Sequence, residues 1–289
     1  MQNLSFWLLP PAFKEIINNF LRYKQLRTLS RDYGDLFSKN KKFRNIHLNQ
    51  RCFILATGPS INKQDLRPLK NEHCISVGGF YLHKDISQIS PEYHVEAPNH
   101  PPFEIDAIRL SFNGYKNYFS ENTTIFLGYA PYEFSYVNFL QKNPEFNKKN
   151  IYFLNYIRSP QLIKENYIQP KIWDLTKCLF GCRTVIYSAI QVAVYMGFNQ
   201  IYLLGCDHDY LVDVKRVSNH HFYKEEDGIS DVEHLSAFTS ERWFEEYYYR
   251  WKQYRLMNEY LTSKGVNIYN ATEGGLLDVF PQVEFDKLF

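Results

Sequence analysis

The chain has no long apolar run and no excess of charge of one sign. No apolar stretch is long enough to cross a bilayer, and no basic segment followed by an apolar run and a cleavage site is present near residue 1. The 33 Lys and Arg nearly balance the 31 Asp and Glu, which leaves a net charge of +2. The lack of a signal segment and of a spanning run predicts a cytoplasmic protein. Because basic and acidic residues are interspersed, the charge gives no argument for nucleic-acid binding, and we expect none.

Cysteine is also scarce. The five cysteines form no even set, and several lie in apolar runs, where cysteine behaves as a small buried hydrophobe. Cys178 and Cys182 are closely spaced, but no second pair and no suitably spaced histidine follows them. The cysteines therefore predict a reducing compartment and no zinc site. We also expect no cofactor.

Familiar catalytic signatures are missing as well. The chain lacks the three-glycine dinucleotide fingerprint, the P-loop lysine, the serine-hydrolase elbow, the kinase motifs and the zinc signature of deaminases. Aromatic residues, in contrast, are abundant, with 23 Tyr and 23 Phe. Such rings suit stacking on sugars or bases, but an AT-rich genome would produce the same surplus without any function.

From residue 51 onward, short apolar runs alternate with helical periods. Strands are expected at 52–56, 74–77, 93–96, 124–127, 151–154, 201–204 and 266–269. Helices are expected at about 61–71, 105–119, 184–197 and 241–264. Apolar strands separated by helices predict an α/β fold, a Rossmann-like parallel sheet sandwiched by helices. We expect residues 49–289 to form this single domain, with a polar lid at about 213–238.

Residues 1–48 differ from the rest and predict an N-terminal helical extension. Ile16, Ile17, Phe20 and Leu21 recur at helical spacing beside basic residues. Such a helix could lie on the inner face of the cytoplasmic membrane. It could equally pack on the domain or on a second subunit of a homo-oligomer. The acidic residues that interrupt its basic face further on favour packing over membrane contact.

Polar residues follow the predicted strands, where ligands of parallel sheets bind. The first strand runs into Thr57, Gly58, Pro59 and Ser60, a turn that opens a predicted helix. Backbone N–H groups in such a turn hold phosphates. The alternative is a tight turn in which Ser60 only caps the helix.

Later strand ends and one helix start supply further candidates for binding a nucleotide. They are Gly78, Gly79, Asn99, Gly205, Asp207, Asn270, Thr272, Glu273 and Gly274, with Arg183 and Thr184 at the start of the helix at 184–197. A guanidinium at a helix N-terminus suits a phosphate or carboxylate. Asp207 and Asp209 could bind a divalent cation, or could simply cap their loop.

The lid carries a histidine pair, His220 and His221, followed closely by Tyr223. These histidines lie in a polar loop rather than on an apolar face, so burial in the core explains them less well than it explains most histidines. Histidine titrates near neutral pH and is suited to take a proton from a hydroxyl nucleophile. The lid is therefore predicted to carry a general base.

These motifs, taken in order and spacing, resemble a known group. The stretches are FILATGPSI, ISVGGFYLHKD, TVIYSAIQVAVYMGFNQIYLLGCDHDY, NHHFYKEEDG and GVNIYNATEGGLLDVFPQVEF. The group is a bacterial family that joins the single-domain sialyltransferases of glycosyltransferase family 42 to flagellin-glycosylating motility-associated factors and archaeal 6-hydroxymethylpterin diphosphokinases. The resemblance covers about residues 45–289.

The resemblance to the sialyltransferase branch implies a metal-independent, inverting transfer from a cytidine monophosphate (CMP) sugar under a mobile lid. It implies that His221 takes the proton of the acceptor hydroxyl. Tyr210 is the nearest match to a tyrosine that hydrogen-bonds the departing phosphate, displaced by one position, and Tyr223 matches a second on position alone. The turn at 58–60 and the segment 270–275 match nucleotide-binding segments of that branch.

Two positions depart from the pattern of these relatives. Thr57 and Gly78 stand where the relatives usually carry asparagines that meet the nucleotide phosphate and sugar. Thr57 keeps a hydroxyl, whereas Gly78 has no side chain. Either the donor differs from the sialic acid nucleotide or the pocket has been lost or rebuilt, with Asn99 as a possible replacement.

The leading hypothesis is a glycosyltransferase that moves a sialic acid-like sugar from a CMP-activated donor. The acceptor would be a glycan or glycoconjugate hydroxyl in surface polysaccharide or lipooligosaccharide biosynthesis. One alternative is a pterin-type pyrophosphokinase with magnesium on Asp207 and Asp209. Another is a relative that binds a nucleotide or glycan without catalysis.

Overall fold

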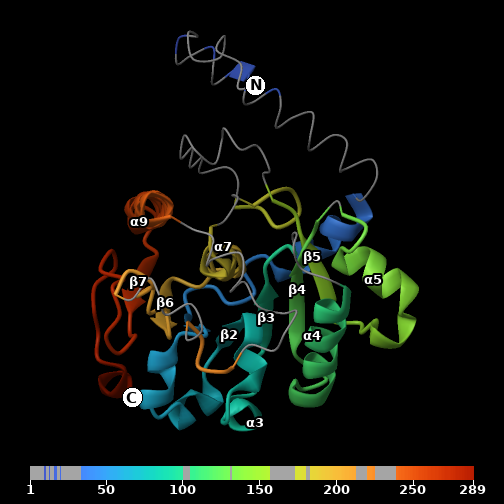
Figure 1. The fold of residues 1–289 in the computed structure, drawn as a ribbon, viewed down its shortest axis with the longest axis horizontal. Coiled ribbons are helices and arrows are strands. Elements are labelled where there is room, and N and C mark those ends of the chain that lie inside the picture. Colours follow the sequence, from blue (N-terminus) through green and yellow to red (C-terminus); the bar gives the residue numbers. More distant parts are fainter. Residues whose placement is uncertain are drawn as a thin grey trace.

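A single parallel sheet organises the molecule. The computed structural model describes residues 34–99, 105–130, 132–156, 173–179, 183–212, 220–224 and 239–289, with isolated positions before residue 34. Within this part, seven strands lie in the order β5-β4-β3-β2-β1-β6-β7 (Figure 1). The chain order reverses at β1, which pairs in parallel with both β2 and β6. The carboxyl ends of strands near such a switch are where ligands of open α/β sheets bind.

All seven predicted strands are confirmed, and their ends differ from the prediction by at most one residue. The strands are β1 (Arg51–Leu55), β2 (Cys74–Val77), β3 (Tyr93–Glu96), β4 (Thr124–Gly128), β5 (Ile151–Leu154), β6 (Gln200–Leu204) and β7 (Asn267–Asn270). Strands that are buried on both faces read as continuous apolar runs, which made them recognisable.

The helices are less regular than the strands. The α-helices are α3 (Ile86–Ile89), α4 (Ile105–Tyr118), α5 (Tyr136–Lys142), α7 (Val185–Met196) and α9 (Ser240–Thr262). The 3-10 helices are η1 (Lys39–Phe43), η2 (Pro59–Lys63), η3 (Arg67–Asn71), η4 (Gly78–Leu82), η5 (Pro144–Phe146) and η7 (Phe285–Leu288). The predictions of α4, α7 and α9 are confirmed, whereas α3 and α5 were not predicted.

The prediction of a helix at 61–71 is wrong. The short helices η2 and η3 occupy this stretch instead. Pro68 has no N–H to continue a helix. Asp65 accepts hydrogen bonds from the backbone N–H (3.1 Å) and the guanidinium (2.8 Å) of Arg67, which turns the chain between the two pieces.

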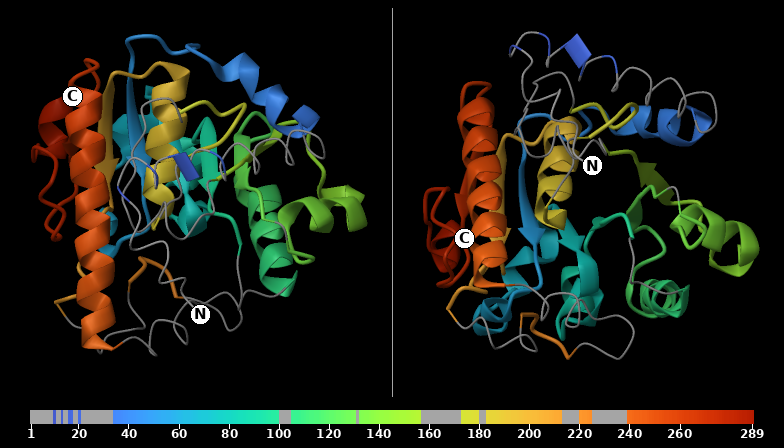
Figure 2. Two further views of the ribbon diagram at one scale, coloured as in Figure 1. Left: turned by 90° about the horizontal axis from the view of Figure 1, so that it is seen from above. Right: turned by 45° about the horizontal axis from the view of Figure 1, so that its top comes forward.

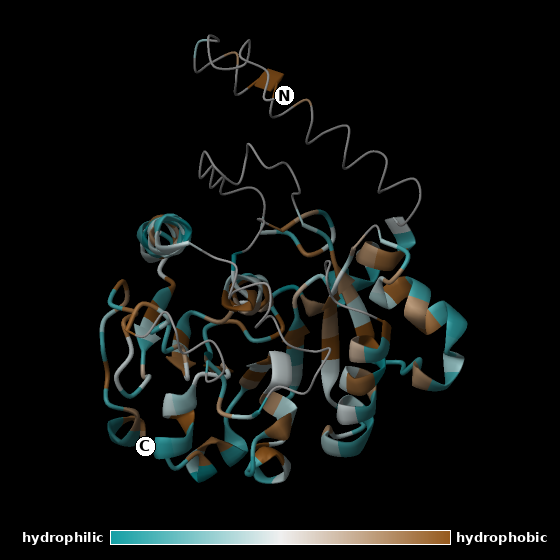
Figure 3. Ribbon diagram, viewed as in Figure 1, coloured by the Kyte–Doolittle hydropathy of each residue, from teal (hydrophilic) through white to brown (hydrophobic). Residues whose placement is uncertain are grey.

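Two hydrophobic clusters cover the two faces of the sheet. Cys52 and Ile54 of β1 belong to one cluster with α7 and α9, while Phe53 and Leu55 belong to the other with α4 and α5. Figure 2 shows α7 and α9 on one side of the strands and α4 on the other. The strands are coloured mainly as hydrophobic and α9 mainly as hydrophilic (Figure 3). The sandwich predicted from the sequence is therefore present.

Residues 34–48, the described end of the predicted N-terminal extension, pack on the domain. Phe37 and Phe43 each lie in one of the two clusters. The buried Asn40 amide donates to the carbonyls of Phe153 (2.8 Å) and Leu175 (2.9 Å). Most of residues 1–33, and the predicted lid apart from 220–224, lie outside the described residues. Membrane contact and an oligomer stay predictions, and no helix in the described ranges is long and apolar enough to span a membrane.

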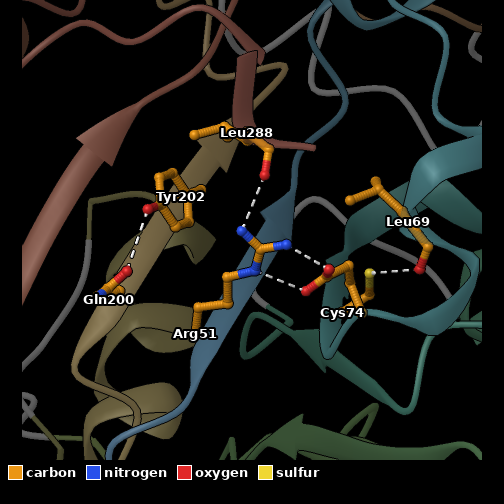
Figure 4. A network of polar contacts seen from close by, with 7 residues as sticks. Arg51, Leu69, Cys74, Gln200, Tyr202 and Leu288 are labelled. Carbon is orange, nitrogen blue, oxygen red and sulfur yellow. Dashed lines mark hydrogen bonds and ion pairs between the residues drawn. The ribbon is translucent and has the colours of Figure 1, made fainter. Parts of the chain in front are cut away.

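An arginine at the start of β1 joins three parts of the chain (Figure 4). The Arg51 guanidinium donates twice to the Glu72 carboxylate, over 2.9 and 2.5 Å, and once to the Leu288 carbonyl over 3.1 Å. These bonds hold the loop before β2 and the C-terminal residues against the central strand. They close the edge of the sheet that lies opposite the strand carboxyl ends.

Candidate functional site

The turn after β1 is joined to the end of β6. The Gly58 N–H donates to the Gly205 carbonyl (2.9 Å). The Ser60 N–H (2.9 Å) and hydroxyl both donate to the Asp207 carboxylate. A Cβ on Gly58 would lie 2.5 Å from the Gly205 oxygen and 2.6 Å from Asp207 Cγ, so this approach requires glycine. The turn predicted to hold a phosphate thus holds a carboxylate of the chain itself.

The backbone donors of this turn are already used. The Ile61 N–H donates to the Gly58 carbonyl (3.2 Å), and Pro59 has no N–H. The helix η2 that follows has only five residues, too few for the dipole on which the phosphate interpretation relied. The structure matches the alternative, a tight turn. Phosphate binding by Gly58, Pro59 and Ser60 stays a prediction that requires Asp207 to release Ser60.

Asp207 is buried, and burial raises the pKa of its carboxyl. The hydrogen bonds from Ser60 lower this pKa, and the negative charge of Asp209 raises it. Ser60 occupies both carboxylate oxygens. Asp207 therefore belongs to the structural connection between β1 and β6. Its arrangement does not fit a magnesium ligand while Ser60 is bound.

The described residues hold one group of side chains within metal-ligating reach of one another, His47, His73 and Glu92. It lies at the amino ends of β2 and β3, at the opposite edge of the sheet from the predicted site. Its atoms bond within the protein, since His73 Nδ1 lies 2.6 Å from Glu92 and His47 Nε2 lies 2.6 Å from the Tyr93 hydroxyl. This group therefore has no part in the predicted site.

The described piece of the lid, residues 220–224, packs over the end of β1. His221 Nδ1 lies 2.7 Å from the Thr57 hydroxyl, and the Phe222 N–H donates to the Thr57 carbonyl (2.9 Å). In the tautomer that carries its proton on Nδ1, His221 donates this proton to the Thr57 hydroxyl. The lone pair is then on Nε2, which can accept a proton as a general base. The structure thus brings together two predicted site residues that are 164 positions apart.

Tyr223 and Gly79 complete this contact. The rings of Tyr223 and His221 stack, with centroids 5.0 Å apart and planes at 4°. A Cβ on Gly79 would lie 2.4 Å from the Tyr223 hydroxyl oxygen, so the glycine makes room for the ring. Gly78 has a φ of 53°, in the left-handed region that glycine tolerates best. Thr57, Gly79, His221 and Tyr223 therefore form one cluster at the carboxyl ends of β1 and β2.

A second cluster surrounds Tyr210. Its ring lies 4.3 Å from the ring of His220 and stacks on Trp243 of α9 at 5.7 Å. The Arg250 guanidinium lies 5.6 Å from the Tyr210 ring and 5.5 Å from the Tyr247 ring. Because His220 precedes His221 in the chain, the two clusters are continuous. Arg250 was not predicted as a site residue, although the run YYYRW around it is a signal of a cation lined by aromatic rings.

His208 lies buried behind this second cluster. It has a φ of 47°, and its Nε2 lies 2.8 Å from the Tyr254 hydroxyl. Burial and the charge of Arg250 hold the pKa of His208 well below its usual range. The imidazole is therefore neutral and structural.

The segment after β7 bonds to the end of β6, where the Cys206 N–H donates to the Thr272 hydroxyl (3.0 Å), and also to itself. The Asn270 amide donates to the Leu277 carbonyl (2.7 Å), and its oxygen accepts from the Thr272 N–H (3.0 Å). Glu273 and Gly274 are exposed. The predicted ribose contacts of this segment stay predictions, and the buried Asn270 serves to shape the loop.

Arg183 is not available to an anion in this arrangement. Its Nη1 lies 2.5 Å from the Glu246 carboxylate, and its guanidinium lies 4.6 Å from the Tyr249 ring. The pair ties the start of α7 to α9. Thr184 follows as the N-cap of α7, and Asn99 donates to the Phe134 carbonyl. The nucleotide contacts of these residues stay predictions.

These features define an α/β protein in which a histidine-bearing segment, residues 220–224, lies over the switch point of a parallel sheet. The family model described as 6-hydroxymethylpterin diphosphokinase MptE-like matches residues 18–213. The chain belongs to this MptE-like family, which confirms the resemblance found in its sequence. A search of curated proteins finds no match.

Two sialyltransferase structures are among the similar folds. The monofunctional alpha-2,3-sialyltransferase Cst-I from Campylobacter jejuni is 18% identical, with 81% of this chain and 80% of that chain covered and a TM-score of 0.47. The sialyltransferase CstII from Campylobacter jejuni, in complex with cytidine-5'-monophosphate, is 14% identical, with 82% and 85% covered and a TM-score of 0.44. Such distant likeness says nothing of the activity of this chain.

Proposed function

We propose that this protein transfers a group from an activated nucleotide to an acceptor hydroxyl, with His221 as the general base. The observation that carries the proposal is the hydrogen bond between His221 Nδ1 and the Thr57 hydroxyl at the carboxyl end of β1. Thr57 orients the imidazole, and Nε2 takes the acceptor proton as the hydroxyl oxygen attacks the donor. Tyr210 and Tyr223, which flank the histidine pair, hydrogen-bond the departing phosphate.

The donor that best suits this arrangement is a CMP-linked, sialic acid-like sugar. The acceptor oxygen bonds to the anomeric carbon of the sugar as the bond from that carbon to the phosphate oxygen of CMP breaks. Because CMP leaves as a stable anion, the transfer needs no metal. The motif resemblance to family 42 sialyltransferases supports this donor. The acceptor is then a glycan or glycoconjugate hydroxyl of a surface polysaccharide or lipooligosaccharide.

Membership of the MptE-like family favours a second candidate, diphosphate transfer to a pterin-like alcohol. In that reaction the alcohol oxygen attacks the β-phosphorus of a nucleoside triphosphate, and the monophosphate leaves. His221 takes the alcohol proton in this case as well. Asp207 and Asp209 would have to hold the magnesium, and Asp207 is bonded to Ser60 as arranged.

A thermal-shift panel separates the two candidates. CMP, CDP, UDP, GDP and ATP are each tested with and without magnesium. Stabilisation by CMP that is independent of magnesium supports the sugar transferase, because only nucleotide bound to the folded state raises the melting temperature. Stabilisation by ATP that depends on magnesium supports the diphosphokinase.

Turnover of the donor so identified then tests the base. His221→Ala is expected to abolish transfer while nucleotide affinity survives. The matched control is His73→Ala, at the opposite edge of the sheet, which is expected to keep full activity. Full activity of His221→Ala would remove the proposed base.

A further inference from the structure

The partly buried side chain of Arg250, beside the candidate site, carries two buried donors that lack a hydrogen-bond partner among the described residues. In the described structure, Nε and Nη1 of Arg250 are buried and have no hydrogen-bond partner. Arg183, whose Nε is also buried without a hydrogen-bond partner in this part of the chain, differs from Arg250 because its Nη1 is paired with the Glu246 carboxylate. Burying a charged donor without an acceptor costs free energy, so folding alone gives no reason for this guanidinium.

The surroundings of Arg250 hold the charge in place without neutralising it. The rings of Tyr210 and Tyr247 lie 5.6 and 5.5 Å from the guanidinium, which is cation–π distance. Tyr247 is itself fixed, since its hydroxyl donates to the His208 carbonyl over 2.7 Å. The neighbouring His208 is neutral. Arg250 is thus positioned by aromatic rings and leaves hydrogen-bond donors unused.

The Arg250 donors lie close to the proposed reaction site. Tyr210 joins Arg250 to His220, whose ring is 4.3 Å away, and His220 adjoins the proposed base His221. The Arg250 side chain comes from α9, and Tyr210 comes from the segment after β6, so the fold brings them to one place. A planar guanidinium with free N–H groups matches phosphate or carboxylate oxygens.

We propose that Arg250, together with Tyr210, forms an anion subsite that holds the phosphate or the carboxylate of the donor. The inference rests on the proposed function and adds the residue that binds the charge of the substrate. The bound anion accepts hydrogen bonds from the guanidinium, and this gain strengthens binding of charged donors over uncharged ones.

The test compares Arg250→Met with Arg255→Met. Arg255 is an exposed arginine on the same helix and is the matched control. Binding of CMP, cytidine and N-acetylneuraminic acid is measured by calorimetry for the wild type and both variants. Arg250→Met is expected to weaken CMP binding by about tenfold to a hundredfold, the range for a charged hydrogen bond, and to leave cytidine binding unchanged. A loss confined to N-acetylneuraminic acid assigns the subsite to the sugar carboxylate instead.

The melting temperature without ligand provides a second readout. Removal of an unpaired buried charge is expected to leave the melting temperature unchanged or to raise it. A structural arginine would lower it. The inference is overturned if Arg250→Met melts at a lower temperature than the wild type and binds CMP with the same affinity as the wild type.

Failure of the inference is distinguishable from failure of the proposed function. If Arg250→Met binds CMP normally and His221→Ala abolishes transfer, the function stands and the subsite does not. If the wild type binds no nucleotide, binding of pyrophosphate is measured instead. Pyrophosphate binding that is lost in Arg250→Met but kept in Arg255→Met would support the anion subsite even though the proposed function fails. Absence of binding by every one of these anions overturns both proposals.

Discussion

At the scale of single residues, the contact between Gly79 and Tyr223 holds the lid segment against the sheet. An alanine Cβ at position 79 would lie 2.4 Å from the tyrosine hydroxyl oxygen. Gly79→Ala is expected to cost about 1–3 kcal/mol of unfolding free energy through overpacking. In a Tyr223→Ala background the same change is expected to cost close to nothing. Urea denaturation of the four proteins checks the coupling, and an equal loss in both backgrounds would contradict it.

His208 makes stability depend on pH. Its pKa is lowered in the folded state, mainly by burial and also by Arg250. The unfolded chain therefore binds a proton below about pH 6.5 that the folded chain does not bind. The stability contributed by the neutral imidazole is present above that pH and is lost as pH falls toward the folded pKa. His47 and His83, whose pKa values burial also lowers, act with the same sign.

We expect the melting temperature of the wild type to fall from about pH 7.5 to about pH 5. His208→Asn is expected to flatten this dependence, and asparagine tolerates the positive φ at this position. The control is Tyr254→Phe, which removes the hydrogen bond to His208 but keeps the histidine and therefore the slope. An unchanged slope in His208→Asn would show that other groups set the acid sensitivity.

At the scale of elements, α7 shows how local capping and burial act together. Thr184 accepts a hydrogen bond from the Ile186 N–H at the first turn, and Gly197 ends the helix with a φ of 95°. The helix between them is mostly buried against β1, β2 and β3. Its sequence is apolar nearly all round, which is expected of a helix inside the sandwich.

The role of Thr184 as a cap is separable from its predicted role in nucleotide binding. Thr184→Ala is expected to cost about 1 kcal/mol of unfolding free energy, because it removes the acceptor of an N-terminal N–H. Thr184→Ser keeps the hydroxyl and is expected to retain most of the stability. If capping is the whole role, CMP affinity is the same in both variants. If Thr184→Ala loses more free energy of CMP binding than free energy of unfolding, the predicted contact between Thr184 and the nucleotide is supported.

At the scale of the whole molecule, the central strand joins the two cores. Ile54 faces the core under α7, and Leu55 faces the core under α4 and α5. Both side chains are fully buried. The two halves of the sandwich are therefore expected to unfold together.

Ile54→Ala and Leu55→Ala test this unity. Each is expected to lower the unfolding free energy by about 2–5 kcal/mol, the usual loss for a large apolar side chain in a core. Near-ultraviolet and far-ultraviolet circular dichroism are expected to report one coincident urea transition in each variant. Two separated transitions, with one core lost before the other, would contradict a single cooperative domain.

The candidate site was only partly predictable from the sequence. Thr57, Gly79, His221 and Tyr223 were identified because each follows a strand or lies in the lid, and the structure brings them together. Arg250 was missed because it lies in the middle of a long helix, where an arginine is normally solvated. Its significance depends on which side chains surround it, and those come from a different part of the chain.

The sequence by itself determined the seven strands, since strands covered on both faces are mostly apolar. It also determined which polar residues stand at the strand ends. Only the tertiary structure decided that Asp207 bonds Ser60 across 147 positions and that Nε and Nη1 of Arg250 have no acceptor in the described part of the chain. The physical reason is that local patterns set backbone conformation and burial, whereas the partner of a charge depends on which strands and helices become neighbours.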